Sequence, residues 1–269
     1  MRVTLRTLWL QLNIGVATFL QGGLVILASL VGVKGKLYWW AARSWSRWLL
    51  RASACTVTVE GLDNISPDRP QIFVSNHVSH VDVIALAANI PKRFRFVAKK
   101  ELGRIPFFGT AWKAAGHISV DRSDRASAVA SLDAAGRVIR RDKSCVVIFP
   151  EGTRSTLPEM LPFKKGAFML ALHTGIEIIP AAVVGTRAIL PKGAWRLRAG
   201  PVIVRFGAPI DTTHYDEGTR DELMEVVRAR IERLLDAPPA VPPPEPDPAA
   251  QQQLTAEARR RGEADRLNG

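Results

Sequence analysis

The strongest constraint in this sequence is a run of 26 residues without a charged side chain. The run extends from Leu8 to Val33 and is mostly apolar. As a helix rising ~1.5 Å per residue, it is long enough to cross the ~30 Å hydrocarbon core of a bilayer. Gln11, Asn13, Gln21 and the Gly22–Gly23 pair interrupt it. The run therefore predicts a membrane-associated helix with an imperfect span.

The distribution of charge also indicates a membrane. Residues 1–59 contain seven Lys and Arg and no Asp or Glu, so they supply +7 of the formal net charge of +12. This combination argues against a nucleic-acid partner, because DNA-binding proteins are basic but have no need of a long uncharged run. A cleaved signal peptide is the competing interpretation, although no small-x-small cleavage site followed by a polar region is evident.

A second apolar segment follows the first. Four of the seven Trp lie between residues 39 and 48, and Arg43, Arg47 and Arg51 recur at i, i+4 and i+8. An arginine stripe beside Trp and Leu predicts a helix in the lipid headgroup layer; the alternative is an ordinary amphipathic helix on a soluble core. We expect residues 1–55 to form a membrane-anchoring helical pair. Positive charge on both flanks of the first run leaves a single span and a one-leaflet hairpin open.

Residues 56–236 alternate between β-branched runs and helical patterns. Strands are predicted at 56–60, 71–75, 93–98, 117–120, 145–150, 177–185 and 202–207, and helices near 81–90, 107–115, 124–141, 164–174 and 216–236. This alternation predicts an α/β domain whose mixed, largely parallel sheet is flanked by helices. Residues 237–269 hold seven of the 18 prolines between 238 and 248, which is typical of a disordered tail that chemistry does not need.

Composition excludes two further classes. A hydrophobic fraction of 47% is too high for a chain disordered throughout. Cys55 and Cys145 are the only cysteines, which excludes a disulfide scaffold and indicates thiols in a reducing compartment.

His77 and Asp82 are the first candidates for chemistry. They follow an apolar strand and precede an apolar helix, where ligands bind in open α/β sheets. Five residues of continuous helix would point the two side chains ~140° apart, so they meet only if His77 lies in the loop and Asp82 in the first helical turn. A carboxylate bonded to one imidazole nitrogen would leave the other as a general base. A purely structural polar cluster explains such a pair equally well.

Metal binding and serine hydrolysis are the alternative chemistries, the first for this same segment. His77, His80 and Asp82 offer three kinds of metal ligand, but no further His, Cys or Glu cluster accompanies them. A serine hydrolase lacks support because no G-x-S-x-G motif occurs.

A candidate oxyanion site follows the predicted strand at 145–150. Gly152 lets the backbone approach a ligand closely, and Arg154 offers a planar fork of donors. Thr153 and Ser155 add hydroxyl groups, so the loop has what a phosphate site needs. A surface turn with a solvated Arg is the alternative. Lys99 and Lys100, followed by Ile105, Phe107 and Phe108, suit a charged headgroup with an apolar tail.

These segments together resemble the glycerolipid acyltransferase family, and most closely its 1-acyl-sn-glycerol-3-phosphate acyltransferases. The resemblance extends from about residue 70 to 187. It rests on four blocks in the family's order: Asn76 to Asp82, Lys99 to Leu102 continuing through Pro106 to Gly109, Phe149 to Ser155, and Ile179 to Ala181. The Pro-rich tail has no counterpart in the resemblance.

The resemblance implies acyl transfer from a thioester to the sn-2 hydroxyl of lysophosphatidic acid, without a covalent intermediate. It implies that His77 is the base and that Asp82 orients it. Substrate phosphate would be held by Glu151, Gly152, Thr153 and Arg154, supported by Lys100 and Arg122, and Pro180 would shape the acyl-donor region. It implies no metal and no bound cofactor.

The expected partners are membrane lipids and either acyl-CoA or acyl carrier protein. The expected location is the cell membrane, with the catalytic domain on the cytoplasmic face. Acyl transfer to another lyso-lipid, such as lyso-ornithine lipid, is the first alternative. A non-catalytic membrane lipid-binding protein is a more remote one.

Overall fold

The computed structural model describes residues 5–33, 35–120, 125–157, 159–194 and 196–239. Those up to Ala237 belong to one compact unit, which includes both N-terminal helices and the sheet. The predicted tail lies almost wholly outside the described residues, as does Arg122.

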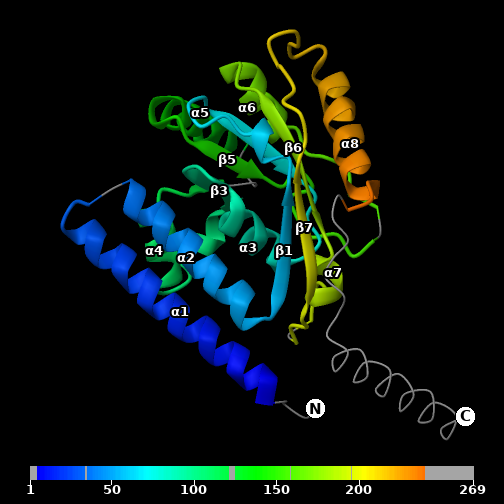
Figure 1. The fold of residues 1–269 in the computed structure, drawn as a ribbon. Helices are drawn as coiled ribbons and strands as arrows, with labels where there is room; N and C mark the ends of the chain where they lie inside the picture. Colours follow the sequence, from blue (N-terminus) through cyan, green and yellow to red (C-terminus); the bar gives the residue numbers. More distant parts are fainter. Residues whose placement is uncertain (1–4, 34, 121–124, 158, 195, 240–269) are drawn as a thin grey trace, which may run out of the picture. The chain divides into compact units, whose positions relative to one another are not determined.

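A seven-stranded sheet forms the centre of the fold (Figure 1). Its strands occur in the spatial order β1-β7-β6-β2-β5-β3-β4. All neighbours are parallel except β6 and β7, so the predicted mixed, largely parallel sheet is confirmed. The strands are β1 (Cys55–Glu60), β2 (Gln71–Ser75), β3 (Phe94–Lys99), β4 (Ile118–Val120), β5 (Cys145–Ile148), β6 (Ile178–Val184) and β7 (Gly200–Phe206).

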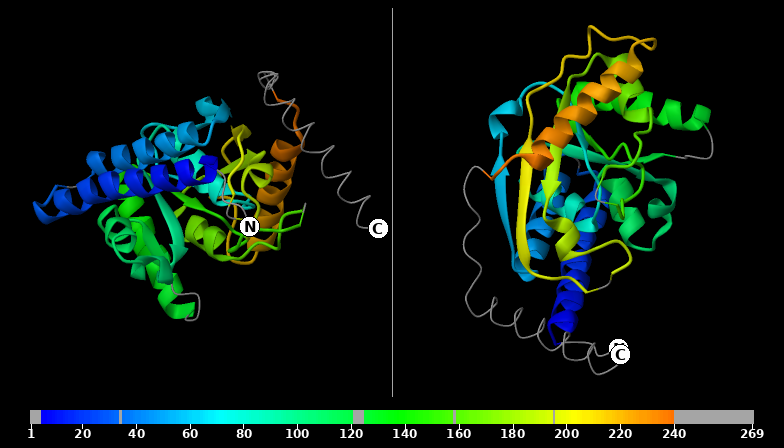
Figure 2. Two further views of the ribbon diagram at one scale, coloured as in Figure 1. Left: turned by 90° about the horizontal axis from the view of Figure 1, so that it is seen from below. Right: turned by 90° about the vertical axis from the view of Figure 1, so that its right-hand side faces the viewer.

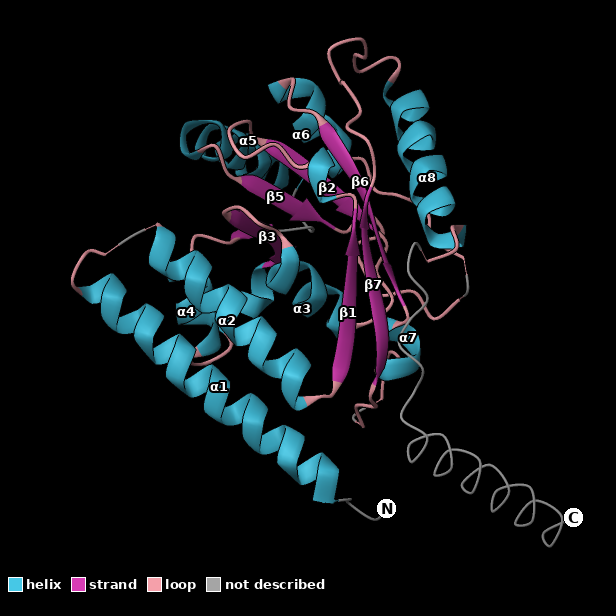
Figure 3. Cartoon of the chain, in the orientation of Figure 1, coloured by secondary structure: helices cyan, strands magenta, loops and turns pink. Residues whose placement is uncertain are grey.

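Helices cover both faces of the sheet (Figure 3). Strands β2 and β5 are buried on both sides and read as continuous apolar runs, as central parallel strands do. Phe73 and Val147 enter one core with α2, α3 and α4, whereas Ile72 and Val146 enter the other with α5, α6 and α8. The helices are α1 (Leu5–Leu30), α2 (Lys36–Ala52), α3 (His80–Asn89), α4 (Phe108–Ala114), α5 (Arg125–Asp142), α6 (Gly166–Thr174), α7 (Thr186–Ile189) and α8 (Arg220–Asp236), with 3₁₀ turns η1 (Leu62–Asn64) and η2 (Lys100–Arg104).

Helices α1 and α2 lie side by side, and α1 also packs on α4 (Figure 2). The polar residues of the apolar run take part in this packing. Trp48 donates its indole N–H to Asn13 Oδ1 at 2.9 Å, and Trp45 donates to Thr18 Oγ1 at 3.1 Å. Asn13, one of the interruptions in the run, is therefore a contact position between the two helices.

Two of the three arginines in the predicted stripe of α2 make contacts within the protein. Arg43 Nε and Arg47 Nε donate to the carbonyl of Ala88, at 3.1 and 3.2 Å, so these side chains contact the end of α3. The last carbonyls of a helix lack intrahelical donors and carry a partial negative charge, which accounts for the attraction. Arg51 is exposed.

Candidate active site

Parallel neighbours β2 and β5 bring two of the sequence blocks together. Their carboxyl ends lie at the same edge of the sheet, and the loops that follow them carry His77 and residues 151–155. The loops are joined directly: Ser155 donates its backbone N–H to the His77 carbonyl at 2.7 Å. Asn76 completes the edge by exchanging two hydrogen bonds with the backbone of Val183 on β6.

The predicted His–Asp pair is formed. His77 lies in the loop, Asp82 lies in the first turn of α3, and His77 Nδ1 is 2.9 Å from Asp82 Oδ2. The His77 ring stacks on Phe149 with a centroid separation of 4.1 Å. Nδ1 and one face of the imidazole are thus occupied, which leaves Nε2 for a substrate.

Asp82 is fully buried, so its charge depends on hydrogen bonds. Oδ2 also accepts the backbone N–H groups of Val78 and Ser79, at 2.7 and 2.8 Å. Ser79 is the N-cap of α3, and its hydroxyl in turn accepts the N–H of Val81. The capping box that starts the helix therefore also holds the carboxylate against His77.

Glu151 lies beneath the loops. Its side-chain oxygens accept the backbone N–H groups of His77 at 2.7 Å and of Leu161 at 2.9 Å. Burial raises the pKa of Glu151, and the two backbone donors oppose that increase. This contact positions the backbone of His77, a role that differs from the phosphate binding predicted for Glu151.

Arg154 carries the cation of the site. Among the described residues, no hydrogen bond or ion pair engages its guanidinium, although the carbonyl of Arg154 accepts from Lys192 Nζ at 2.8 Å. Gly152 supports the turn with a φ of 72°, which an L-residue adopts only with strain. Burial lowers the pKa of His80, Arg154 and His77 lower it further, and Asp82 opposes the decrease.

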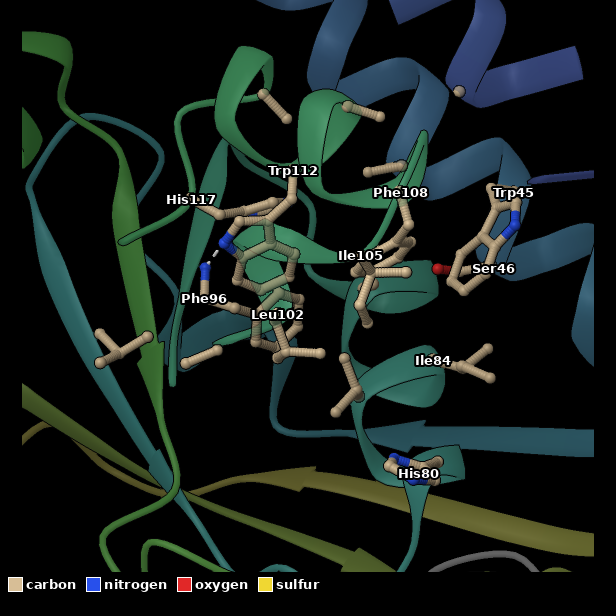
Figure 4. A pocket seen from close by; sticks show the side chains of 18 of the residues that line it. Trp45, Ser46, His80, Ile84, Phe96, Leu102, Ile105, Phe108, Trp112 and His117 are labelled. Atoms are coloured by element: carbon tan, nitrogen blue, oxygen red, sulfur yellow. Dashed lines mark hydrogen bonds between the residues drawn. The ribbon is translucent and has the colours of Figure 1, made fainter. Parts of the chain in front are cut away.

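A cavity of about 810 Å³ connects this site to the N-terminal helices (Figure 4). His77, Gly152, Thr153 and Arg154 are among the residues that line it. The remaining wall is mostly apolar and aromatic, from β3, α3, α4, α2 and α1, and includes Phe96, Phe108, Trp112, Ile84 and Val25. A charged group and an acyl chain can occupy such a cavity together.

Two predicted residues lie elsewhere. Lys99, and not Lys100, lines the cavity. Pro180 is buried within β6, opposite Val74, and its carbonyl accepts the N–H of Gly207 at 2.8 Å. Pro180 therefore does not lie on the cavity. Within the described residues, no group of three His, Cys, Asp or Glu side chains could hold a metal ion.

Sequence reasoning missed Thr186 and the contribution of α1. Thr186 donates its hydroxyl hydrogen to Asp82 Oδ1. Thr18, Gln21 and Gly22 of α1 line the cavity. Both contacts join segments far apart in sequence, and no local pattern signals them.

The α/β fold, the hydrogen-bonded pair of His77 and Asp82, and the cavity that His77 shares with Arg154 are features expected of an acyltransferase. Residues 56–184 match the family described as Acyltransferase. The chain belongs to this family, and its curated relatives carry the name 1-acyl-sn-glycerol-3-phosphate acyltransferase.

Relatives from a plant and a yeast illustrate the similarity. The Cocos nucifera protein is 34% identical over 73% of this chain and 62% of its own length. The Saccharomyces cerevisiae protein is 34% identical over 77% of this chain and 68% of its own length. The chain spans about three fifths of the length of several plant relatives. Among solved structures, the 1-acyl-sn-glycerophosphate (LPA) acyltransferase PlsC from Thermotoga maritima matches with a TM-score of 0.72 and 27% identity, covering 87% of this chain and 97% of that one.

Proposed function

We propose that this protein transfers a fatty acyl group from a thioester to the sn-2 hydroxyl of 1-acyl-sn-glycerol-3-phosphate, giving phosphatidic acid. The observation that carries the proposal is that His77 and Arg154, whose guanidinium has no partner among the described residues, line one largely apolar cavity. In a lysophosphatidic acid substrate, the phosphate would face Arg154, the hydroxyl would face His77, and the acyl chain would lie along the apolar wall. The names of the relatives support the same acceptor.

His77 Nε2 removes the proton of the acceptor hydroxyl, and the oxygen attacks the thioester carbonyl carbon. The C–S bond then breaks, and the thiolate takes the proton back from the imidazolium. Asp82 holds the imidazole in the required tautomer and stabilises its positive form. No covalent acyl-enzyme, metal or bound cofactor is needed. Arg154 binds the phosphate, and Gly152 and Thr153 line the same cavity.

Helix α1 supports a location of the site at a membrane. It is long and apolar enough to span one, and it exposes large hydrophobic side chains that include Leu8, Leu12, Leu20 and Leu27. An acyl chain that enters the cavity beside α1 avoids crossing water, which costs ~0.8 kcal/mol per CH₂. We place the catalytic domain on the cytoplasmic face of the cell membrane, where acyl-CoA and acyl carrier protein are available.

The central test is His77→Ala in the full chain reconstituted in vesicles. Acyl transfer should fall by at least ~10²-fold, because a positioned general base contributes ~10²–10⁴-fold. His214→Ala is the matched control, since that histidine has an 82% exposed side chain. Equal turnover of the two variants would refute the role of His77 as base, and unchanged vesicle binding would show that the anchor is intact.

Arg154→Ala tests the phosphate site. It should lower kcat/KM for the phosphorylated acceptor by an amount equivalent to about 2–5 kcal/mol, with a much smaller effect on the thioester donor. Arg230→Ala, on the exposed side of α8, is the control. Acceptors without phosphate, including lyso-ornithine lipid, should be insensitive to Arg154→Ala. Preference of the native chain for lyso-ornithine lipid would instead support the alternative acceptor.

A further inference from the structure

The two side-chain oxygens of Asp82 have unequal sets of donors. Oδ2 accepts hydrogen bonds from His77, Val78 and Ser79. Oδ1 accepts from Thr186 Oγ1, which is its only donor among the described residues. Both side chains have 0% exposure, so solvent cannot replace this donor.

The backbone around Thr186 is fixed by its surroundings. Thr186 begins α7 just after the end of β6. Strands β6 and β2 are parallel neighbours, so Thr186 lies at the same edge of the sheet as the loop of His77, which follows β2. Gly185 has a φ of 91°, and a Cβ there would lie 2.3 Å from the Pro201 carbonyl oxygen. A side chain at 185 would therefore displace Thr186.

The other end of α7 is tied to the same helix start. Ser79 donates its hydroxyl hydrogen to the carbonyl of Leu190 at 2.8 Å. The segment from Thr186 to Leu190 thus contacts both Asp82 and the N-cap residue of α3. These contacts orient Thr186 with respect to the catalytic pair.

We propose that Thr186 is a positioning residue for acyl transfer, which holds the Asp82 carboxylate at the rotation that faces Oδ2 toward His77 Nδ1. This inference rests on the proposed role of His77 as general base. Without the hydroxyl, Oδ1 would be a buried charged oxygen with no donor, and the carboxylate would turn to recover one. The imidazole would then lose its fixed orientation.

The first experiment compares Thr186→Val with Thr186→Ser. Valine has nearly the shape of threonine but lacks the hydroxyl, and should lower kcat by about 10–100-fold, because small misplacements of catalytic groups can cost ~10²-fold. KM for donor and acceptor should stay within about twofold, because substrate contacts are retained. Serine keeps the donor and should restore most of kcat.

A double-mutant cycle separates positioning from general structure. In an Asp82→Ala background, Thr186→Val should cause little further loss, because the group through which it acts is gone. Thr213→Val is the matched control: Thr213 also donates to an aspartate, Asp211 Oδ1 at 2.8 Å, but on the surface. It should leave kcat unchanged.

A spectroscopic measurement covers the case in which no acyl transfer is found. The Nδ1–H proton resonance of His77, assigned by its loss in His77→Gln, should shift or broaden in Thr186→Val and remain in Thr186→Ser. An unchanged resonance, full kcat in Thr186→Val, or equal losses in both backgrounds would overturn the positioning role. If His77→Ala is inactive while Thr186→Val is fully active, the proposed function stands and this inference fails.

Discussion

At the scale of the residue, His117 is a buried titratable group that the proposed mechanism does not use. Its Nδ1 accepts the backbone N–H of Phe96 at 3.1 Å, so the ring is held in its neutral form. Trp112 lies against it, with ring centroids 4.2 Å apart. Burial lowers the pKa of His117 to about 3, and Arg95 contributes to the decrease.

This depressed pKa predicts a specific loss of stability in acid. Between pH ~6.5 and pH ~3 the unfolded chain binds a proton at His117 that the folded chain does not, so the free energy of unfolding falls by about 1.4 kcal/mol per pH unit as pH decreases. His117→Asn keeps an acceptor for Phe96 but cannot titrate. Its plot of unfolding free energy against pH should be flatter than that of the native chain, whereas His214→Asn should match the native slope. Parallel plots for all three proteins would contradict the assignment.

The sequence predicted the residues of the site better than their contacts. His77 and Asp82 could be paired because both follow one strand, with His77 in the loop and Asp82 in the first turn of the next helix. Glu151 belongs to the same motif as Arg154, yet its side chain lies beneath the loop, and no spacing rule distinguishes a ligand from a support. Thr186 is 104 residues from Asp82, so only the order of strands in the sheet brings them together.

At the scale of the element, periodicity located the helices and strands well, because each buries a regular apolar face. It could not tell what a polar face contacts. The arginines of α2 have the spacing of a headgroup-binding stripe, yet Arg43 and Arg47 contact the end of α3. The short helix α7 was also missed, since one turn is too short to show a period.

Substitutions of Arg43 and Arg51 should therefore differ in their effects on stability and on vesicle binding. Arg43→Ala removes a charge-assisted hydrogen bond to Ala88 and should lower the free energy of unfolding by about 1–2 kcal/mol. Arg51→Ala, two helical turns along, should leave stability within about 0.5 kcal/mol. It should weaken binding to anionic vesicles by ~1 kcal/mol, as for a basic side chain near a charged surface. Chemical denaturation measures the change in stability, and vesicle sedimentation measures the change in binding. Weaker vesicle binding by Arg43→Ala with unchanged stability would instead support a headgroup contact for Arg43.

At the scale of the whole molecule, helix α1 and the α/β domain share one cavity. Gly22 of α1 makes room for Phe107, since a Cβ at Gly22 would lie 2.7 Å from that ring, and Phe19 stacks on the same ring at 5.8 Å. Exposed leucines occupy other positions of α1. The helix thus has one face for the cavity and another for the surroundings.

Leu12→Asp tests whether the exposed face of α1 binds the membrane independently of the face that lines the cavity. Leu12 is 61% exposed, and a carboxylate there should weaken vesicle binding at least ~10-fold, because the transfer of a charged side chain into the bilayer is unfavourable. Transfer to a short-chain acceptor dissolved below its critical micelle concentration should change less than about twofold. Leu62→Asp, at a 44% exposed leucine of η1, is the control and should bind vesicles normally. Equal losses on dissolved and vesicle-bound acceptors would mean that Leu12 supports the fold.

Because α1 lines the cavity, replacing this helix with that of another family member should affect which acyl chains bind. Thr18, Gln21, Gly22 and Val25 line the cavity in which we propose that the substrate binds, so α1 would do more than attach the chain to a membrane. We expect a chimera that receives α1 from another family member to acquire part of that member's preference for acyl-chain length. Its own sheet and the loops around His77 and Arg154 would be unchanged. Replacing α1 only to change how the protein attaches to a membrane would therefore also change its acyl-chain selectivity.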